Sequence, residues 1–225
     1  MIPWEFLGSA RAPGDGEELS LYRRGNEFSI RVKACQLMGS TAYGSEEALA
    51  ELVCARLAGR LRPRILIGGL GMGYTVGAAL RHLGADSEVV VAELVQAVVD
   101  WNRGPLADLA GRPLEDPRVT VRVIDVARVL RTERDAYDAV LLDVDNGPEG
   151  LTRKGNNWLY AQVGLEATQA ALRSAGLLGV WSSHPNRAFT RRLRHVGFTV
   201  EEVSVRARGQ RGGPQHLIWL AQRSA

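Results

Sequence analysis

The chain has 225 residues and a formal net charge of +3, and 45% of its residues are hydrophobic and 24% are charged. This composition is ordinary for a soluble globular protein, and the length suits one α/β domain with a small appendage. No run approaches the roughly 18 uncharged apolar residues of a membrane helix. Residues 1–5 lack the basic and apolar regions of a signal peptide, so we expect a cytoplasmic protein that does not bind membranes.

The cysteine, histidine and arginine patterns argue against several kinds of site. Cys35 and Cys54 are too few for a disulfide framework and form no CxxC pair, and the four histidines show no metal-ligand spacing. We therefore expect no metal site. Nearly all cations are arginines, which concentrate at 187–194 and 206–211, and the first cluster is typical of the solvated face of an amphipathic helix. We do not expect a nucleic-acid partner.

The first 45 residues predict a small β region. Residues 18–22 and 28–32 alternate apolar and polar side chains around a short turn, which is typical of a β-hairpin. Residues 36–44 are predicted to form a loop. A helix is then predicted with Ser45 as its N-cap and acidic residues in its first turn, ending near Gly59.

From residue 64 onward, apolar strands alternate with helices. The strands are predicted at 65–67, 88–92, 119–123, 139–142, 178–181, 199–205 and 216–221. The helices are predicted at 74–83, 95–110, 127–131, 159–174 and 189–195. Short, continuously apolar strands separated by helices indicate a parallel sheet buried on both faces. The last two strands have no helix between them, which indicates an antiparallel final strand.

The predicted fold class is therefore α/β, with a Rossmann-like, seven-stranded, mostly parallel sheet whose last strand is reversed. A small N-terminal β-hairpin region precedes the sheet. This is the arrangement of class I methyltransferases. We divide the chain into an N-terminal hairpin and loop at 1–45 and a Rossmann-like domain that binds S-adenosylmethionine at 46–225.

The first strand of the sheet leads into a glycine-rich loop at 68–73. Its glycines permit positive φ angles and let a ligand approach the backbone closely. The spacing does not fit the dinucleotide fingerprint G-x-G-x-x-G, and no lysine stands nearby for a Walker A loop. G-x-G-x-G is the methyltransferase form. We therefore predict that Gly69, Leu70, Gly71 and Gly73 bind S-adenosylmethionine.

Acidic residues at the ends of the next two strands support this prediction. Glu93 lies about 20 residues beyond the loop, where a carboxylate can accept hydrogen bonds from both hydroxyls of a ribose, and we include the adjacent Leu94 in the cofactor site. Asp125 can accept the adenine amino hydrogens while the backbone N–H of Val126 meets the ring. Asp125 can also cap the helix that follows, because a carboxylate has several acceptor positions.

Asp143 ends the fourth strand at the carboxyl edge of the sheet, where doubly wound folds bind their ligands. We predict that Asp143 contacts the cofactor and is catalytic, either as a general base or by binding an amine or hydroxyl of the substrate. Asp145 and Asn146 follow in a loop and are predicted to contact the substrate.

With these elements in place, the sequence resembles the spermidine synthase family, most strongly over residues 64–160. The resemblance implies a hairpin region ahead of a Rossmann-like domain. It also implies substrate contacts for Gln36, Tyr43, Trp158 and Tyr160, which correspond to the family's glutamine, tyrosine and aromatic pair. Relatives often pair through their N-terminal hairpins, so the resemblance implies a homodimer.

Departures from the family pattern bear on the chemistry. Gly71 stands where the family usually carries an aspartate, and Asn146 stands at the position of a second family aspartate. Arginines at 206–211 replace a tyrosine-bearing stretch. A diamine is a dication that needs several carboxylates and aromatics, and nearby arginines would repel it.

These departures lead us to expect an S-adenosylmethionine-dependent transferase on a spermidine-synthase-like scaffold. We predict a methyltransferase that acts on a small-molecule amine or hydroxyl. The first alternative is an aminopropyltransferase that uses decarboxylated S-adenosylmethionine. A second alternative is a non-catalytic protein that binds an adenosyl ligand or serves as a scaffold. The sequence does not identify the acceptor.

Overall fold

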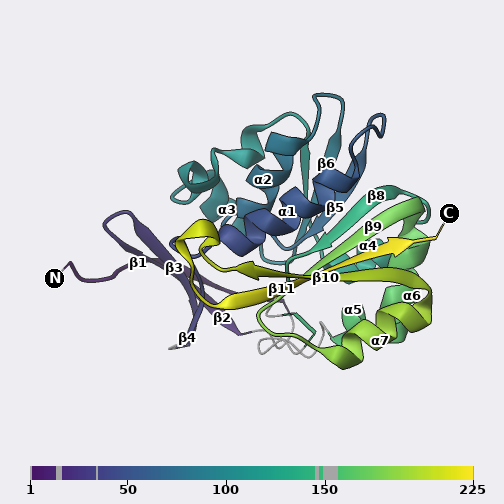
Figure 1. The fold of residues 1–225 in the computed structure, drawn as a ribbon. Helices are drawn as coiled ribbons and strands as arrows, with labels where there is room; N and C mark the ends of the chain where they lie inside the picture. Colours follow the sequence, from purple (N-terminus) through teal and green to yellow (C-terminus); the bar gives the residue numbers. More distant parts are fainter. Residues whose placement is uncertain (1, 14–16, 34, 145–146, 149–156, 225) are drawn as a thin grey trace.

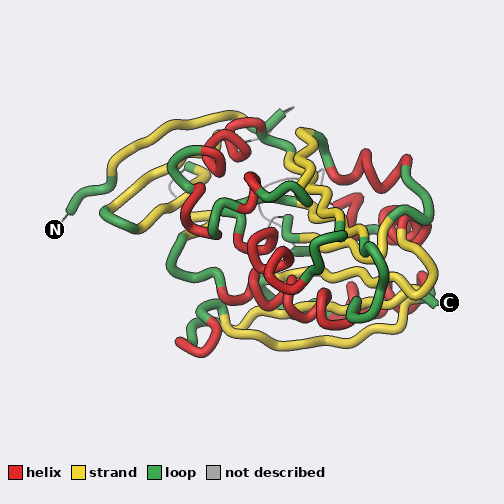
Figure 2. The backbone as a smooth tube through the Cα atoms, turned by 90° about the horizontal axis from the view of Figure 1, so that it is seen from above, coloured by secondary structure: helices red, strands yellow, loops and turns green. Residues whose placement is uncertain are grey.

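The computed structural model describes residues 2–13, 17–33, 35–144, 147–148 and 157–224 (Figure 1). Its N-terminal part is an antiparallel sheet in the order β1-β2-β3-β4, and Figure 2 shows this sheet extending from the end of the molecule opposite the C-terminus. The strands are β1 (Glu5–Arg11), β2 (Glu18–Arg24), β3 (Glu27–Val32) and β4 (Cys35–Gly39).

The predicted hairpin forms the centre of this sheet, which has two more strands than the pattern indicated. Strand β4 occupies part of segment 36–44, where the prediction of a loop was wrong. It is short, and its last residues are partly buried, so no clear alternation marks it. Strand β1 carries a register shift between Phe6 and Gly8, and such a bulge interrupts the alternation that identifies a strand.

The remaining strands build the predicted seven-stranded sheet, in the order β10-β11-β9-β8-β5-β6-β7. The strands from β9 to β7 pair in parallel, and β11 is antiparallel to both of its neighbours, β9 and β10. This confirms the predicted fold class, including the reversed last strand. The strands are β5 (Arg64–Gly68), β6 (Glu88–Glu93), β7 (Val119–Val123), β8 (Tyr137–Leu142), β9 (Leu172–Ser182), β10 (Phe198–Arg206) and β11 (Gln215–Arg223).

Helices cover both faces of this sheet, with α1, α2 and α3 on one side and α5, α6 and α7 on the other (Figure 1). Alternate residues of β5 pack into opposite layers: Ile65 and Ile67 join the cluster under α1–α3, and Leu66 joins the one under α4–α7. The helices are α1 (Gly44–Arg56), α2 (Tyr74–His82), α3 (Gln96–Arg103), α4 (Val126–Thr132), α5 (Asn157–Tyr160), α6 (Gln162–Ala171) and α7 (Arg187–Val196). Short 3-10 turns follow at η1 (Ala107–Ala110), η2 (Pro113–Glu115) and η4 (Gly209–Arg211).

The start of α1 differs from the prediction. The helix begins at Gly44, directly after Tyr43, so Ser45 lies inside the first turn and does not cap it. The Ser45 side chain is fully buried. A buried hydroxyl needs hydrogen-bond partners, and those of Ser45 lie in the functional site described below.

Two other helices are shorter than predicted. Segment 95–110 contains α3 and then the 3-10 turn η1. Segment 159–174 is divided between α5 and α6, and strand β9 already begins at Leu172. At the division, Gly164 lies so close to the carbonyl of Trp158 that a side chain would not fit. The close approach of α5 and α6 therefore requires glycine at position 164, and the apolar pattern does not record this division.

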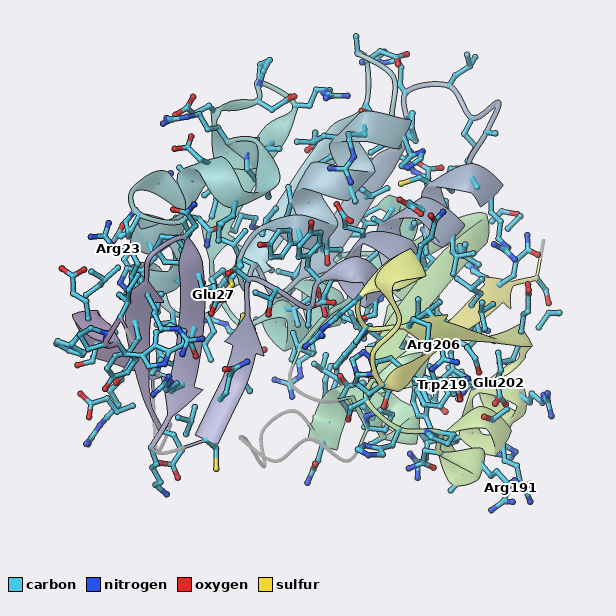
Figure 3. All side chains as sticks on the ribbon, turned by 60° about the vertical axis from the view of Figure 1, so that its left-hand side comes forward. Arg23, Glu27, Arg191, Glu202, Arg206 and Trp219 are labelled. Carbon is cyan, nitrogen blue, oxygen red and sulfur yellow. The ribbon has the colours of Figure 1, made fainter. Side chains whose placement is uncertain are left out.

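Helix α7 is fixed to the sheet by a chain of polar side chains. Trp219 Nε1 donates to Thr190 Oγ1 at 2.9 Å, and Thr190 Oγ1 donates to Glu202 Oε1 at 2.7 Å. Figure 3 shows Trp219 and Glu202 in this region and Arg191 on the outer side of the helix. Most arginines of α7 are exposed, as the amphipathic pattern predicted. Within the described part of the chain, no helix has the length and apolarity needed to cross a membrane.

Candidate functional site

Two adjoining cavities lie where the N-terminal sheet meets the carboxyl ends of the central strands. The first cavity has a volume of about 160 Å³ and is lined by β3, β4 and the residues that follow β5, β6, β7 and β8. The second cavity has a volume of about 70 Å³ and lies against β4, α1 and the glycine loop. Met38, Gly71 and Asp143 line both cavities, so these residues form part of the boundary between them.

The glycine loop turns from β5 into α2 through three left-handed residues. The φ angles of Gly69, Gly71 and Gly73 are 88°, 53° and 84°. A side chain at Gly69 would collide with the backbone carbonyl of Asp143, so the close approach of β5 and β8 requires glycine there. Gly69 lines the first cavity, Leu70 lines the second, and Gly73 is the N-cap of α2 and lines neither.

Glu93 stands at the end of β6, and its side chain connects this strand to the loop. Its carboxylate accepts hydrogen bonds from the backbone N–H groups of Leu70 and Val95, both at 2.9 Å. The side chain is only 8% exposed, and this burial raises the pKa of the carboxyl above its ordinary value, while the two amides oppose the rise. Each oxygen uses one lone pair in these bonds, so the carboxylate can still accept from a ligand in the first cavity.

Asp125 lies one strand further along the same edge. Its Oδ1 accepts from the backbone N–H of Ala127 at 2.9 Å, which makes Asp125 the N-cap of α4, as predicted. Asp125, Val126 and Leu94 all line the first cavity together with Glu93. The structure therefore brings the acidic residues of β6 and β7 to one cavity, with apolar side chains between them.

Asp143 follows β8 and is the only one of these acids that lines both cavities among the described residues. Its Oδ2 accepts a hydrogen bond of 2.5 Å from the hydroxyl of Thr75 in α2. Burial raises the pKa of Asp143 above its ordinary value, and the hydrogen bond from Thr75 opposes the rise. A carboxyl group with a pKa moved toward neutrality is suited to accept a proton from a substrate.

Glu46, in the first turn of α1, also lines the second cavity. Burial raises its pKa, and repulsion from Asp143 adds to the rise, whereas a hydrogen bond from Ser45 lowers it. Our sequence reasoning missed this residue, because two acids at a helix start are explained by the helix dipole. The available signal was helical spacing: Glu46 precedes the buried Leu49, Ala50 and Val53 on one face of α1.

Comparison with known proteins shows which proteins the chain is similar to. No family model matches the sequence. A polyamine aminopropyltransferase from Korarchaeum cryptofilum is 27% identical over 132 residues, which are 58% of this chain and 39% of that protein. The spermidine synthase of Thermotoga maritima superposes with a TM-score of 0.77, at 15% identity, over 97% of this chain and 73% of its own. The chain has a spermidine synthase-like fold.

A second solved structure supports the same assignment of the fold. A spermidine synthase in complex with the transition-state analogue AdoDATO has a TM-score of 0.76 and 15% identity, and the match covers 97% of this chain and 72% of that one. The sequence match to the curated aminopropyltransferase spans about two fifths of that relative's length. The match to a curated aminopropyltransferase supports the aminopropyl alternative better than the methyltransferase that we predicted from the departures.

The residues that the family resemblance added lie mostly outside the two cavities. Gln36 is exposed and accepts a hydrogen bond from Ser29 at 3.3 Å, while the next two residues of β4 line the cavities in its place. Tyr43 stacks on Tyr74, which does line the second cavity, with ring centroids 4.2 Å apart. Asp145 and Asn146 lie outside the described residues.

The aromatic pair that opens α5 has other partners. The Arg131 guanidinium lies over the ring of Trp158, at 4.1 Å from its centroid, on the surface side of α4. Tyr160 is buried, and its hydroxyl donates to the carbonyl of Val144 at 3.1 Å. The Tyr160 hydroxyl thus holds the backbone at Val144, directly after Asp143. Neither aromatic ring lines a cavity.

The charged residues in the described lining of the two cavities are all of one sign. This described lining contains the acids Glu17, Glu46, Glu93, Asp125 and Asp143, and no lysine, arginine or histidine. We had expected arginines of segment 206–211 to repel a cationic substrate here. Instead, none of the described side chains of that segment lines either cavity, and Arg206 lies at the end of β10, where it donates to the carbonyl of Gly213 (Figure 3). Among the described residues, no cluster could hold a metal ion.

Proposed function

We propose that the protein is an aminopropyltransferase, which moves an aminopropyl group from decarboxylated S-adenosylmethionine to a small amine. The observation that carries the proposal is that Asp143 lines two adjoining acidic cavities, one beside the glycine loop and one beside Glu46. The donor is a sulfonium cation with a cationic amine, and the acceptor is an amine. Buried carboxylates without a cation in the described lining are suited to both.

The first cavity fits the adenosyl part of the donor. Glu93 keeps acceptor capacity for the ribose hydroxyls, and Asp125 and the backbone of Val126 stand at the adjacent strand end for the adenine edge. Apolar side chains such as Leu94 and Val98 line the same cavity and can pack on the adenine faces. The glycine loop leaves the sulfonium close to the boundary with the second cavity.

The transfer step can then be written with the residues of this chain. The lone pair of the acceptor nitrogen attacks the aminopropyl carbon that is bound to sulfur, a C–N bond forms and the C–S bond breaks. The electron pair of that bond goes to sulfur, which becomes a neutral thioether. The nitrogen loses one proton, and Asp143 is placed to accept it. The chain otherwise contributes by aligning the two reactants.

Electrostatics favours the decarboxylated donor over S-adenosylmethionine itself. The carboxylate of a methionine group would be repelled by ionised Asp143 at the second cavity, whereas the amine of an aminopropyl group would be attracted. Gly71 lacks the family's aspartate, but it lines the same cavity as Glu46, whose ionised form a bound ammonium group would favour. Methyl transfer stays a second candidate, because Gly71 offers a backbone N–H and no charge of its own to a methionine carboxylate.

Calorimetry with each sulfonium tests the proposal. Decarboxylated S-adenosylmethionine is expected to bind at least about tenfold more tightly than S-adenosylmethionine, which corresponds to about 1.4 kcal/mol. Release of 5′-methylthioadenosine in the presence of putrescine is expected to follow. Glu93→Ala should abolish donor binding, whereas Glu51→Gln, on the exposed side of α1, should not change it. Tighter binding of S-adenosylmethionine would favour methyl transfer. If neither sulfonium bound, the non-catalytic alternative would take precedence.

A further inference from the structure

A row of three polar side chains leads away from the second cavity. The Ser45 hydroxyl donates to Glu46 Oε2 at 2.7 Å, and its oxygen lies 2.9 Å from Nδ1 of His216. Ser45 and Glu46 belong to α1, whereas His216 is on β11, 171 positions away in the sequence from Ser45. Ser45 is fully buried, and His216 is half-buried at the start of β11. The row therefore joins the cavity to the surface.

This row has the chemistry of a proton path. A hydroxyl can accept one hydrogen bond and donate another at the same time, so it can pass a proton without being ionised. The proposed transfer releases one proton in each turnover, into cavities whose described lining contains acids alone as charged groups. We propose that Glu46, Ser45 and His216 carry this proton from the second cavity to the solvent, an inference that rests on the proposed transfer.

The exit step balances for one proton in each turnover. Asp143 passes the proton to ionised Glu46 across the second cavity that both line. Protonated Glu46 gives its proton to the Ser45 oxygen, and the Ser45 hydroxyl proton moves to Nδ1 of His216. The proton on Nε2 of the same ring leaves to water. The carboxyl loses one proton, the hydroxyl is restored, and the neutral imidazole changes from the Nε2–H tautomer to the Nδ1–H tautomer. After this transfer, ionised Glu46 accepts a hydrogen bond from the Ser45 hydroxyl, and the Ser45 oxygen accepts a hydrogen bond from Nδ1–H of His216. A half-turn of the imidazole ring then exchanges its two nitrogens and restores an acceptor next to Ser45 for the following turnover.

The surroundings support each end of this path. Glu46 faces Asp143 across the cavity and has Glu47 beside it, and both negative charges favour its protonated form, as burial does. His216 faces His184, and the ring of Trp181 stands edge-on to it with centroids 4.9 Å apart. Burial and His184 lower the pKa of His216 below its ordinary value, so the ring is uncharged at about pH 7, as the tautomer change requires.

Nitrogen-15 NMR of histidine-labelled protein tests the path without any turnover, since the two neutral tautomers differ in their nitrogen shifts. His216→Gln assigns the signals among the four histidines. Between about pH 6.5 and about pH 10, wild-type His216 is expected to stay neutral and to change from mainly Nε2–H to mainly Nδ1–H as Glu46 ionises. The midpoint of this change is expected near the raised pKa of Glu46, about 8.

Ser45→Ala and Glu46→Gln should each abolish the tautomer change, and Glu51→Gln, an exposed acid on the same helix, should leave it intact. A wild-type ring whose tautomer ratio stays constant over this pH range would overturn the proton path, with no dependence on how the variants fold. Persistence of the change in Ser45→Ala would overturn the role of the hydroxyl. A tautomer change in a protein that binds neither sulfonium would retain the path and refute the proposed function alone.

Discussion

Replacing Glu46 by glutamine should make the ligand-free protein more stable at alkaline pH. The folded protein holds the pKa of Glu46 at about 8, compared with 4.5 for the free side chain. An acid with a raised pKa favours folding below its unfolded pKa, and this contribution is lost as the pH rises through the folded pKa. The shift corresponds to an upper bound of about 5 kcal/mol lost between those two values.

Asp143 shares the repulsion that raises this pKa, so the loss assigned to Glu46 alone is smaller, on the order of 2 to 4 kcal/mol. Glutamine has the same shape as a protonated glutamic acid and can still accept from Ser45. Wild-type protein and Glu46→Gln are therefore expected to have similar stability near about pH 4.5, and the variant is expected to be more stable by that amount above about pH 8.

Urea unfolding at several pH values measures the difference, with Glu51→Gln as the matched control on the same helix. The control removes one exposed acid and is expected to follow the wild type within about 0.5 kcal/mol at each pH. Parallel pH profiles for wild type and Glu46→Gln would refute the reasoning, because they would mean that Glu46 ionises as freely in the folded protein as in the unfolded chain.

Two further predictions concern neighbouring groups. Thr75→Val removes the hydroxyl that stabilises ionised Asp143, so the pKa of Asp143 should rise. In the pH–rate profile of 5′-methylthioadenosine release with putrescine, the acid limb should then move about one pH unit upward. An unchanged acid limb would rule out Asp143 as the base. Asp125→Ala loses the α4 N-cap and should lower the free energy of unfolding by about 1 kcal/mol, whereas Asp125→Ser keeps a cap. Both Asp125 variants should weaken donor binding in calorimetry, and intact binding in both would contradict the adenine contact.

The part of the site that could be predicted is the part that the sheet itself assembles. Glu93, Asp125 and Asp143 each follow a strand, and in a parallel sheet the strand ends of one direction meet at one edge. A glycine spacing and three strand ends are therefore enough to predict most of the polar lining of the first cavity. The alternation of apolar strands with helices predicted most of the elements along the chain, and the lack of a helix between the last two strands predicted the reversed strand β11.

The second cavity could not be predicted in this way, because its residues come from elements that no local rule brings together. Met38 reaches it from β4, whose position depends on how the N-terminal sheet packs on the large one, and Glu46 reaches it from α1, which packs on α2 and β9. The effect of the arginines at 206–211 was misjudged for the same reason. Sequence proximity to a loop suggested a charge near the substrate, but Arg206 lies at the end of β10 and Arg208 precedes η4, and neither side chain lines a cavity.

The wall shared by the two cavities has a consequence for how selectivity could change. Met38 and Leu37, from β4, line both cavities, whereas Glu46, Glu93, Asp125 and Asp143 all lie on or next to elements of the seven-stranded sheet and its helices. Side chains of the small sheet thus set the shape of the two cavities, and side chains from the region of the large sheet supply the acidic groups. Under the proposed function, substitutions along β4 should admit a longer or bulkier amine and leave every proton-carrying group in place, so that the range of acceptors and the rate of transfer vary independently.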